Sequence, residues 1–101
     1  MKNILIVGAG NIGFWYLIAA IATKLKVNIF IYDKSLHQIK KFKKRKQFDE
    51  KNINFCTNLS KIPQKIDLAI ISTTSSGRYD LTKLISKKYK VKNFIIEKIV
   101  E

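Results

Sequence analysis

Cysteine, histidine and proline are almost missing from this chain, which holds one of each in 101 residues. The single cysteine, Cys56, excludes a disulfide within the chain and fits a reducing compartment, so we expect a cytoplasmic protein. One cysteine and one histidine are too few for a usual zinc site, and we expect no metal. A chain of this length fits one domain, residues 1–101, with one modest core.

Acidic residues are also scarce, because 7 Asp and Glu face 20 Lys and Arg and leave a net charge of +13. Such a charge raises the question of nucleic acid. Nearly all of it is lysine, however, in a chain rich in isoleucine and asparagine, as A/T-rich genomes encode. The densest run, 40–46, falls in an expected helix whose lysines face solvent. The inner stripe predicted for that helix is Leu36, Ile39 and Phe42. We therefore expect no nucleic-acid partner.

A long unbroken apolar run is missing as well, and we expect no membrane segment. The apolar stretch that ends at Ala22 is interrupted by glycines and by Asn11. Lys2 before it and the Ala-Ile-Ala at 20–22 are features of a secretory signal. The regular spacing of the glycines, and the strand that follows, favour a folded element instead.

Three of the four glycines stand in one motif. Residues 4–7 form a short apolar run typical of a buried strand, and Gly-x-Gly-x-x-Gly at 8–13 then opens a predicted helix. The next predicted strand, 27–32, is followed by Asp33, twenty positions after the last glycine of the motif. This is the dinucleotide-binding fingerprint in its required context of strand, turn, helix and acid.

Each position of the motif has a physical task in this interpretation. Gly8 lets the chain turn out of the strand, Gly10 lets the backbone approach a pyrophosphate, and Gly13 lets the helix pack close to the strand. The free N–H groups at the helix start, around Asn11 and Ile12, face the phosphates. A tight strand-to-helix turn that binds no ligand is the alternative.

Asp33 is the predicted determinant of cofactor choice. Its carboxylate would accept hydrogen bonds from the adenosine ribose hydroxyls, which favours NAD over NADP because a 2′-phosphate would meet a negative charge. Lys34 beside it could reverse that preference by pairing with the 2′-phosphate. A purely structural alternative is that Asp33 caps the helix that begins near Ser35.

The rest of the chain continues to alternate between strand and helix patterns. The predicted elements are a strand at 52–56, a helical turn at 59–63, a buried strand at 67–72, an amphipathic helix at 76–90 and a strand at 92–97. Alternating β and α elements with right-handed crossovers predict a doubly wound parallel α/β sheet of the Rossmann type. About five strands would lie in the order 3-2-1-4-5.

The last third of the chain makes specific a family resemblance that covers the whole chain. The segment 66–74, followed by a helix, a strand and Ile95-Ile96-Glu97-Lys98, is similar to the nucleotide-binding half of the glucose–fructose oxidoreductase/inositol dehydrogenase family. The resemblance implies that Lys98 reaches the substrate and the nicotinamide, with Glu97 as the acid before it. It implies that Ser72, Thr73 and Thr74 line the nicotinamide ribose. It also assigns the motif glycines and Asp33 to the cofactor.

The resemblance implies an NAD(P)-dependent oxidoreductase that acts on a sugar, sugar nucleotide or polyol by hydride transfer. It covers only the first part of such an enzyme, so we expect the substrate domain to be absent and the 101 residues alone to be inactive. Three departures leave the substrate open: Ile99 and Thr74 stand where prolines are common, and Arg78 stands near a frequent histidine. The alternatives are a nucleotide-sensing regulatory module and a noncatalytic interaction domain, with Lys98 then a plain surface lysine.

The first predicted helix is apolar on all sides from Phe14 to Ala22. Gly13, Leu17 and Ala20 share the side expected to face the sheet, whereas Trp15, Ile18 and Ala22 fall on the other side. Exposed apolar patches usually mark an interface. We therefore expect Trp15 and Ile18 to be covered by the missing domain or by a second subunit of a homo-oligomer.

Overall fold

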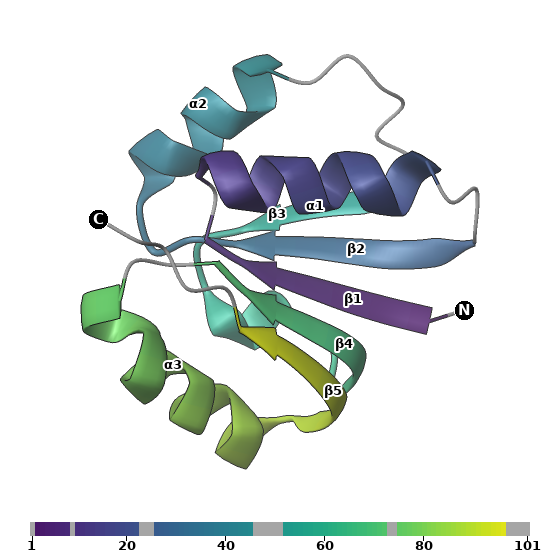
Figure 1. The fold of residues 1–101 in the computed structure, drawn as a ribbon, viewed down its shortest axis with the longest axis vertical. Coiled ribbons are helices and arrows are strands. Elements are labelled where there is room, and N and C mark those ends of the chain that lie inside the picture. Colours follow the sequence, from purple (N-terminus) through teal and green to yellow (C-terminus); the bar gives the residue numbers. More distant parts are fainter. Residues whose placement is uncertain (1, 9, 23–25, 46–51, 73–74, 97–101) are drawn as a thin grey trace.

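Parallel strands form one sheet in this protein. The structure is a computed structural model, and it describes residues 2–8, 10–22, 26–45, 52–72 and 75–96. In this part of the chain the sheet has five strands in the order β3-β2-β1-β4-β5 (Figure 1). They are β1 (Lys2–Val7), β2 (Val27–Tyr32), β3 (Ile53–Cys56), β4 (Lys65–Ile71) and β5 (Lys90–Ile96). Every neighbouring pair is parallel. The predicted fold class and strand order are confirmed.

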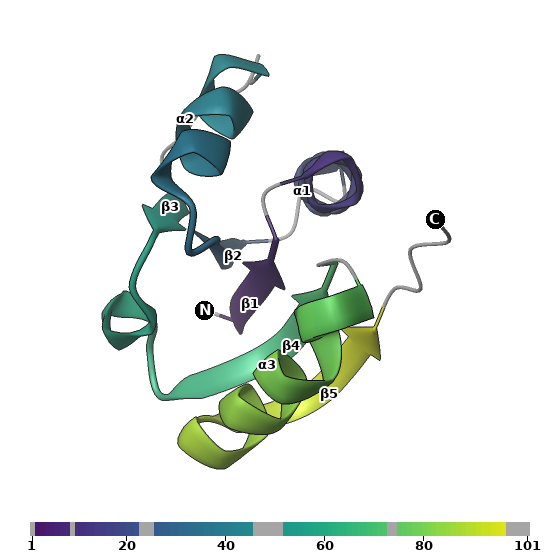
Figure 2. The same cartoon turned by 90° about the vertical axis from the view of Figure 1, so that its left-hand side faces the viewer.

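Helices cover both faces of this sheet. Helices α1 (Asn11–Ala22) and α2 (Leu36–Arg45) lie on one face and α3 (Ser75–Lys88) on the other, as Figure 2 shows. A single 3₁₀ turn, Leu59–Lys61, follows β3 within the predicted helical turn. The arrangement is doubly wound, as expected when each crossover between parallel strands is right-handed.

Alternate residues of β1 feed two separate apolar clusters. Ile6 packs on the α1 and α2 side with Leu17 and Phe42, whereas Leu5 and Val7 pack on the α3 side. The two helices on the first side meet through aromatic rings, because Phe14 lies edge-on to Phe42 with 5.3 Å between ring centroids. A β1 strand that is buried on both faces has the near-continuous apolar sequence typical of parallel sheets.

Element boundaries differ from the prediction mainly at charged residues. Strands β4 and β5 each begin two residues earlier than expected, at Lys65 and Lys90, which are partners in the ladder. Helix α3 accordingly ends at Lys88 rather than at residue 90. The ladder extends back through the apolar pair Ile66 and Val91 to the two lysines. The polar residues Asp67 and Lys92, at which the strands were expected to begin, lie inside the strands instead.

The prediction that Leu36 belongs to the inner stripe of α2 is wrong. Ile39 and Phe42 are 3 % and 1 % exposed, but Leu36 is 56 % exposed. At 100° per residue, Leu36 lies about 90° away from the line midway between Ile39 and Phe42. It is also the first residue of the helix, where the chain is still approaching the sheet.

Helix α1 follows its prediction at the positions whose side chains are described. Leu17 is fully buried and Gly13 is buried, whereas Trp15 is 64 % exposed. Ile18 and Ala20 are half-buried. The side chains of Ile21 and Ala22 lie outside the described residues. Among the described residues, no helix is long and apolar enough to cross a membrane.

Candidate functional site

The carboxyl ends of three central strands meet at one edge of the sheet. Gly8 follows β1, Asp33 follows β2 and Ser72 follows β4. The chain winds outward from β1 to β3 on one side and then returns to build β4 and β5 on the other. Ligands of open α/β sheets bind at this kind of edge, where the strand order reverses. The described residues of the sequence motif therefore lie where such a site is expected.

Gly8 adopts a conformation that requires glycine. Its φ is +107°, and a Cβ there would lie 3.0 Å from the Ser72 Oγ atom. Its N–H donates to the Tyr32 carbonyl oxygen at 2.8 Å, which joins the end of β1 to the end of β2. The turn out of β1 is thereby held against both neighbouring strands.

Gly13 and Gly10 are glycines for different reasons. A Cβ at Gly13 would lie 2.2 Å from the Gly8 carbonyl oxygen, a distance that requires α1 or the turn to move. A Cβ at Gly10, which is exposed, would meet nothing within 4 Å. Packing within the described part of the chain therefore demands glycine at position 13 but not at position 10.

Helix α1 begins beside this turn. The Phe14 N–H donates to the Gly10 carbonyl oxygen at 3.0 Å, as the first turn of the helix forms. The N–H groups of that first turn have no partner within the helix, and no acidic residue stands there to neutralise the positive end of the dipole. The backbone of Asn11 and Ile12 belongs to this turn, while their side chains lie outside the described residues.

Asp33 is held by its own loop. Its Oδ1 accepts a hydrogen bond from the Ser35 N–H at 2.9 Å, and its own N–H donates to the Cys56 carbonyl oxygen at 3.1 Å. The bond that caps α2 comes instead from Ser35, whose Oγ accepts from the Gln38 N–H at 3.3 Å. Asp33 thus orients the chain that enters α2, and the carboxylate stays half-buried at the edge of the sheet.

Two neighbouring side chains are kept neutral. Burial raises the pKa of the Tyr32 phenol, and the negative charge of Asp33 raises it further. Burial likewise raises the pKa of the Cys56 thiol, while the positive charge of Lys61 opposes that shift. Both groups therefore remain protonated at neutral pH.

Ser72 joins β4 to the glycine turn. It is 5 % exposed, and its Oγ lies 2.9 Å from the Val7 carbonyl oxygen and 3.2 Å from that of Gly8. Its backbone N–H also donates to the Val7 carbonyl oxygen, at 2.9 Å.

The remaining predicted residues lie outside the described part of the chain. These are Thr73, Thr74, Glu97 and Lys98. Sequence reasoning did not foresee that Ser35 orients the Asp33 carboxylate. The Ser-x-x-Gln spacing of 35–38, a capping-box pattern, was the signal that could have shown that Ser35 begins the helix.

Comparison with known proteins agrees with this geometry. A solved diketoreductase, described as performing substrate-directed dual catalysis of dicarbonyl compounds, superposes on 97 % of this chain with a TM-score of 0.76 at 16 % identity. The chain spans 42 % of that protein's length, and at this identity the likeness shows the fold. None of the curated proteins compared with the chain matches it.

A family model gives the more specific result, because it matches residues 2–98 and describes an oxidoreductase family with an NAD-binding Rossmann fold. The match includes the glycine turn, Asp33 and Ser72. This chain belongs to the glucose–fructose oxidoreductase/inositol dehydrogenase family of NAD-binding Rossmann domains.

Proposed function

We propose that this chain is the cofactor-binding domain of a sugar, sugar-nucleotide or polyol oxidoreductase and that it prefers NAD to NADP. The observation that carries the proposal is the contrast between two glycines at the switch point of the sheet. Gly13 is required by packing, whereas the space beside Gly10 is open. An open glycine at the start of a helix lets a pyrophosphate approach the backbone.

The described residues fit a dinucleotide at two of its groups, the pyrophosphate and the adenosine ribose. The first turn of α1 would hold the pyrophosphate through backbone N–H groups, with Gly10 leaving room for it. Asp33 would hold the adenosine ribose hydroxyls, and the Ser35 N–H keeps that carboxylate in place at 2.9 Å. A 2′-phosphate would be repelled by the same charge, which supports the preference for NAD.

The nicotinamide, when bound, supplies hydride transfer to or from a carbinol carbon of the substrate. The family resemblance assigns the accompanying proton chemistry to Lys98. Its ammonium group would stabilise negative charge on the substrate oxygen or relay its proton. By the same resemblance, Thr73 and Thr74 would lie around the nicotinamide ribose, and Glu97 is the acid that precedes Lys98 at the cofactor.

Titration with both cofactors tests the proposed preference. Wild-type protein should bind NAD more tightly than NADP, and Asp33→Ala should lose that preference because the ribose acceptor and the repelling charge disappear together. Asp67→Asn, at the opposite edge of the sheet, is the matched control and should leave both affinities unchanged. A wild type that prefers NADP would show that Lys34 outweighs Asp33.

The proposed enzyme needs a substrate domain that these 101 residues do not include. We therefore expect no turnover of NAD by this chain alone with any polyol, and steady reduction of NAD would contradict the proposal. A regulatory module that binds nucleotide without catalysis is the second candidate. The gene sequence after Glu101 separates the two, because an enzyme requires a further α/β domain that carries a catalytic histidine.

A further inference from the structure

The Ser72 hydroxyl sits where β1, β4 and α1 converge. Its oxygen lies 2.9 Å from the Val7 carbonyl oxygen and 3.2 Å from that of Gly8. A serine hydroxyl has one hydrogen, and here that hydrogen faces two carbonyls of the chain itself. The hydroxyl is therefore committed as a donor before any ligand arrives.

The same oxygen limits the space around both structural glycines. A Cβ at Gly8 would lie 3.0 Å from it, and a Cβ at Gly13 would lie 3.2 Å from it. The Gly8 carbonyl oxygen that Ser72 holds is also the atom that would lie 2.2 Å from a Cβ at Gly13. Ser72 thus holds the turn at the point where α1 packs most closely on it.

The burial of Ser72 makes its hydrogen bond to the turn important. Ser72 is the buried polar residue among those described, at 5 % exposure. Without the Ser72 hydroxyl, the Val7 carbonyl would keep the Ser72 N–H as its donor. The Gly8 carbonyl would lose the hydroxyl hydrogen, and its peptide group can relieve that loss by rotating. Rotation of the Gly8 peptide would shift the end of β1 against the start of α1, where the pyrophosphate is proposed to bind.

We propose that Ser72 is a positioning residue that sets the glycine turn in the conformation that receives the cofactor pyrophosphate. This role rests on the proposed dinucleotide binding and differs from the nicotinamide-ribose contact that the family resemblance implies. Ser72 acts through the carbonyls of Val7 and Gly8 and does not donate to the ligand.

Two ligands distinguish these roles, because ADP contains the pyrophosphate but lacks the nicotinamide ribose. In Ser72→Ala we expect the affinities for ADP and NAD to fall together, by about five- to tenfold, which corresponds to the loss of one buried hydrogen bond. The affinity for adenosine, which has no phosphate, should stay unchanged. Loss of NAD affinity with unchanged ADP affinity would overturn the proposal in favour of a direct ribose contact.

Ser72→Cys is the control for packing, since the thiol fills the space of the hydroxyl but donates weakly. It should bind ADP nearly as weakly as Ser72→Ala does, and full recovery in Ser72→Cys would assign the effect to volume and overturn the proposal. Circular dichroism checks that both variants fold. If only Ser72→Cys folds, its ADP affinity decides alone.

Amide chemical shifts give a readout that does not depend on binding. In the ligand-free Ser72→Ala protein the signals of Gly8 and Gly13 should move, while that of Gly77 in α3 should not. Unchanged Gly8 and Gly13 shifts would overturn the positioning role. A wild type that binds neither ADP nor NAD would instead refute the proposed function, so the two failures are distinguishable.

Discussion

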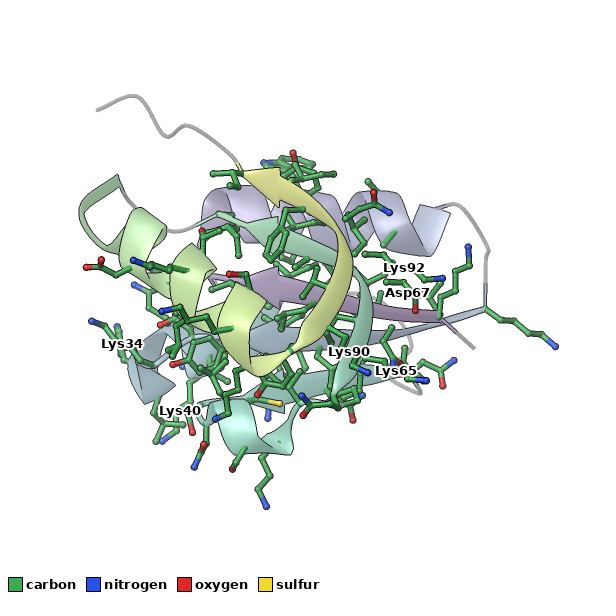
Figure 3. All side chains as sticks on the ribbon, turned by 90° about the horizontal axis from the view of Figure 1, so that it is seen from below. Lys34, Lys40, Lys65, Asp67, Lys90 and Lys92 are labelled. Carbon is green, nitrogen blue, oxygen red and sulfur yellow. The ribbon has the colours of Figure 1, made fainter. Side chains whose placement is uncertain are left out.

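The two edges of the sheet are built from the same parallel strands but are constrained in different ways. At the carboxyl edge, Gly8, Gly13 and Ser72 lie so close together that added Cβ atoms would stand 2.2–3.2 Å from their neighbours. At the amino edge the side chains of Lys65, Lys90 and Lys92 extend into solvent. Figure 3 shows Lys65, Lys90, Lys92 and Asp67 gathered at that end, away from Lys34 and Lys40.

A hydrogen bond between β1 and β4 holds the amino edge, and the charged side chains around it form an exposed ion pair. Asp67 accepts from the Asn3 N–H at 2.8 Å and lies 3.8 Å from the Lys92 ammonium, whose side chain is 77 % exposed. Lys65 and Lys90 are direct neighbours in the ladder, a repulsive pairing that solvent screens. Close packing therefore coincides with the candidate site, and the lysine-rich edge tolerates its charges because water surrounds them.

Gly13→Ala should have the largest effect on stability. Its Cβ would lie 2.2 Å from the Gly8 carbonyl oxygen, so α1 or the turn must move. Overpacking of this kind costs about 3 kcal/mol, which should lower the unfolding temperature by more than 10 °C, at about 4–8 °C for each kcal/mol in a domain of this size. Thermal unfolding followed by circular dichroism measures it. If Gly13→Ala unfolded at the same temperature as the wild type, the turn would be looser than this contact indicates.

Gly10→Ala is the matched change at the same edge. Its Cβ would meet nothing within 4 Å. The free energy of unfolding should change by less than about 0.5 kcal/mol. The methyl group would occupy the space proposed for the pyrophosphate, so the affinity for NAD should fall about tenfold, or about 1.4 kcal/mol. Calorimetric titration and thermal unfolding together test the pair. Loss of stability without loss of affinity would break the contrast between the two glycines.

Asp67→Ala tests the amino edge. It should lower the free energy of unfolding by about 1 kcal/mol, because the Asn3 N–H loses its acceptor. Asp67→Asn retains an acceptor oxygen and should cost less than about 0.5 kcal/mol. Lys92→Gln should be neutral within measurement in urea unfolding. A loss in Lys92→Gln as large as that in Asp67→Ala would show that the ion pair, not the backbone contact, holds this edge.

Trp15→Lys should have the smallest effect on stability, because the Trp15 side chain is already 64 % exposed. The residue lies on the outer side of α1, and we expect its indole to support self-association that the net charge of +13 only partly opposes. Sedimentation should show a smaller average mass for Trp15→Lys than for the wild type. A wild type that is monomeric at all concentrations would contradict the expected self-association.

Short-range pattern was enough to predict much of the carboxyl edge. The glycine spacing predicted the turn, and the structure shows that Gly13 is the close contact and that Gly10 borders open space. Strand 27–32 was predicted at its observed bounds. The exposure of Leu36 was not foreseen, because periodicity identifies an apolar stripe but not where a helix first touches its sheet.

The amino-acid sequence by itself determined the order and type of the elements, because apolar periodicity and glycine positions act within a few residues along the chain. Only the tertiary structure decided the contacts of the Ser72 hydroxyl, which lies against carbonyls 64 and 65 positions away. It also decided that Lys65 and Lys90 would stand side by side. Such contacts join strands that are far apart in the sequence, and their register is fixed only when the apolar faces of those strands are buried together.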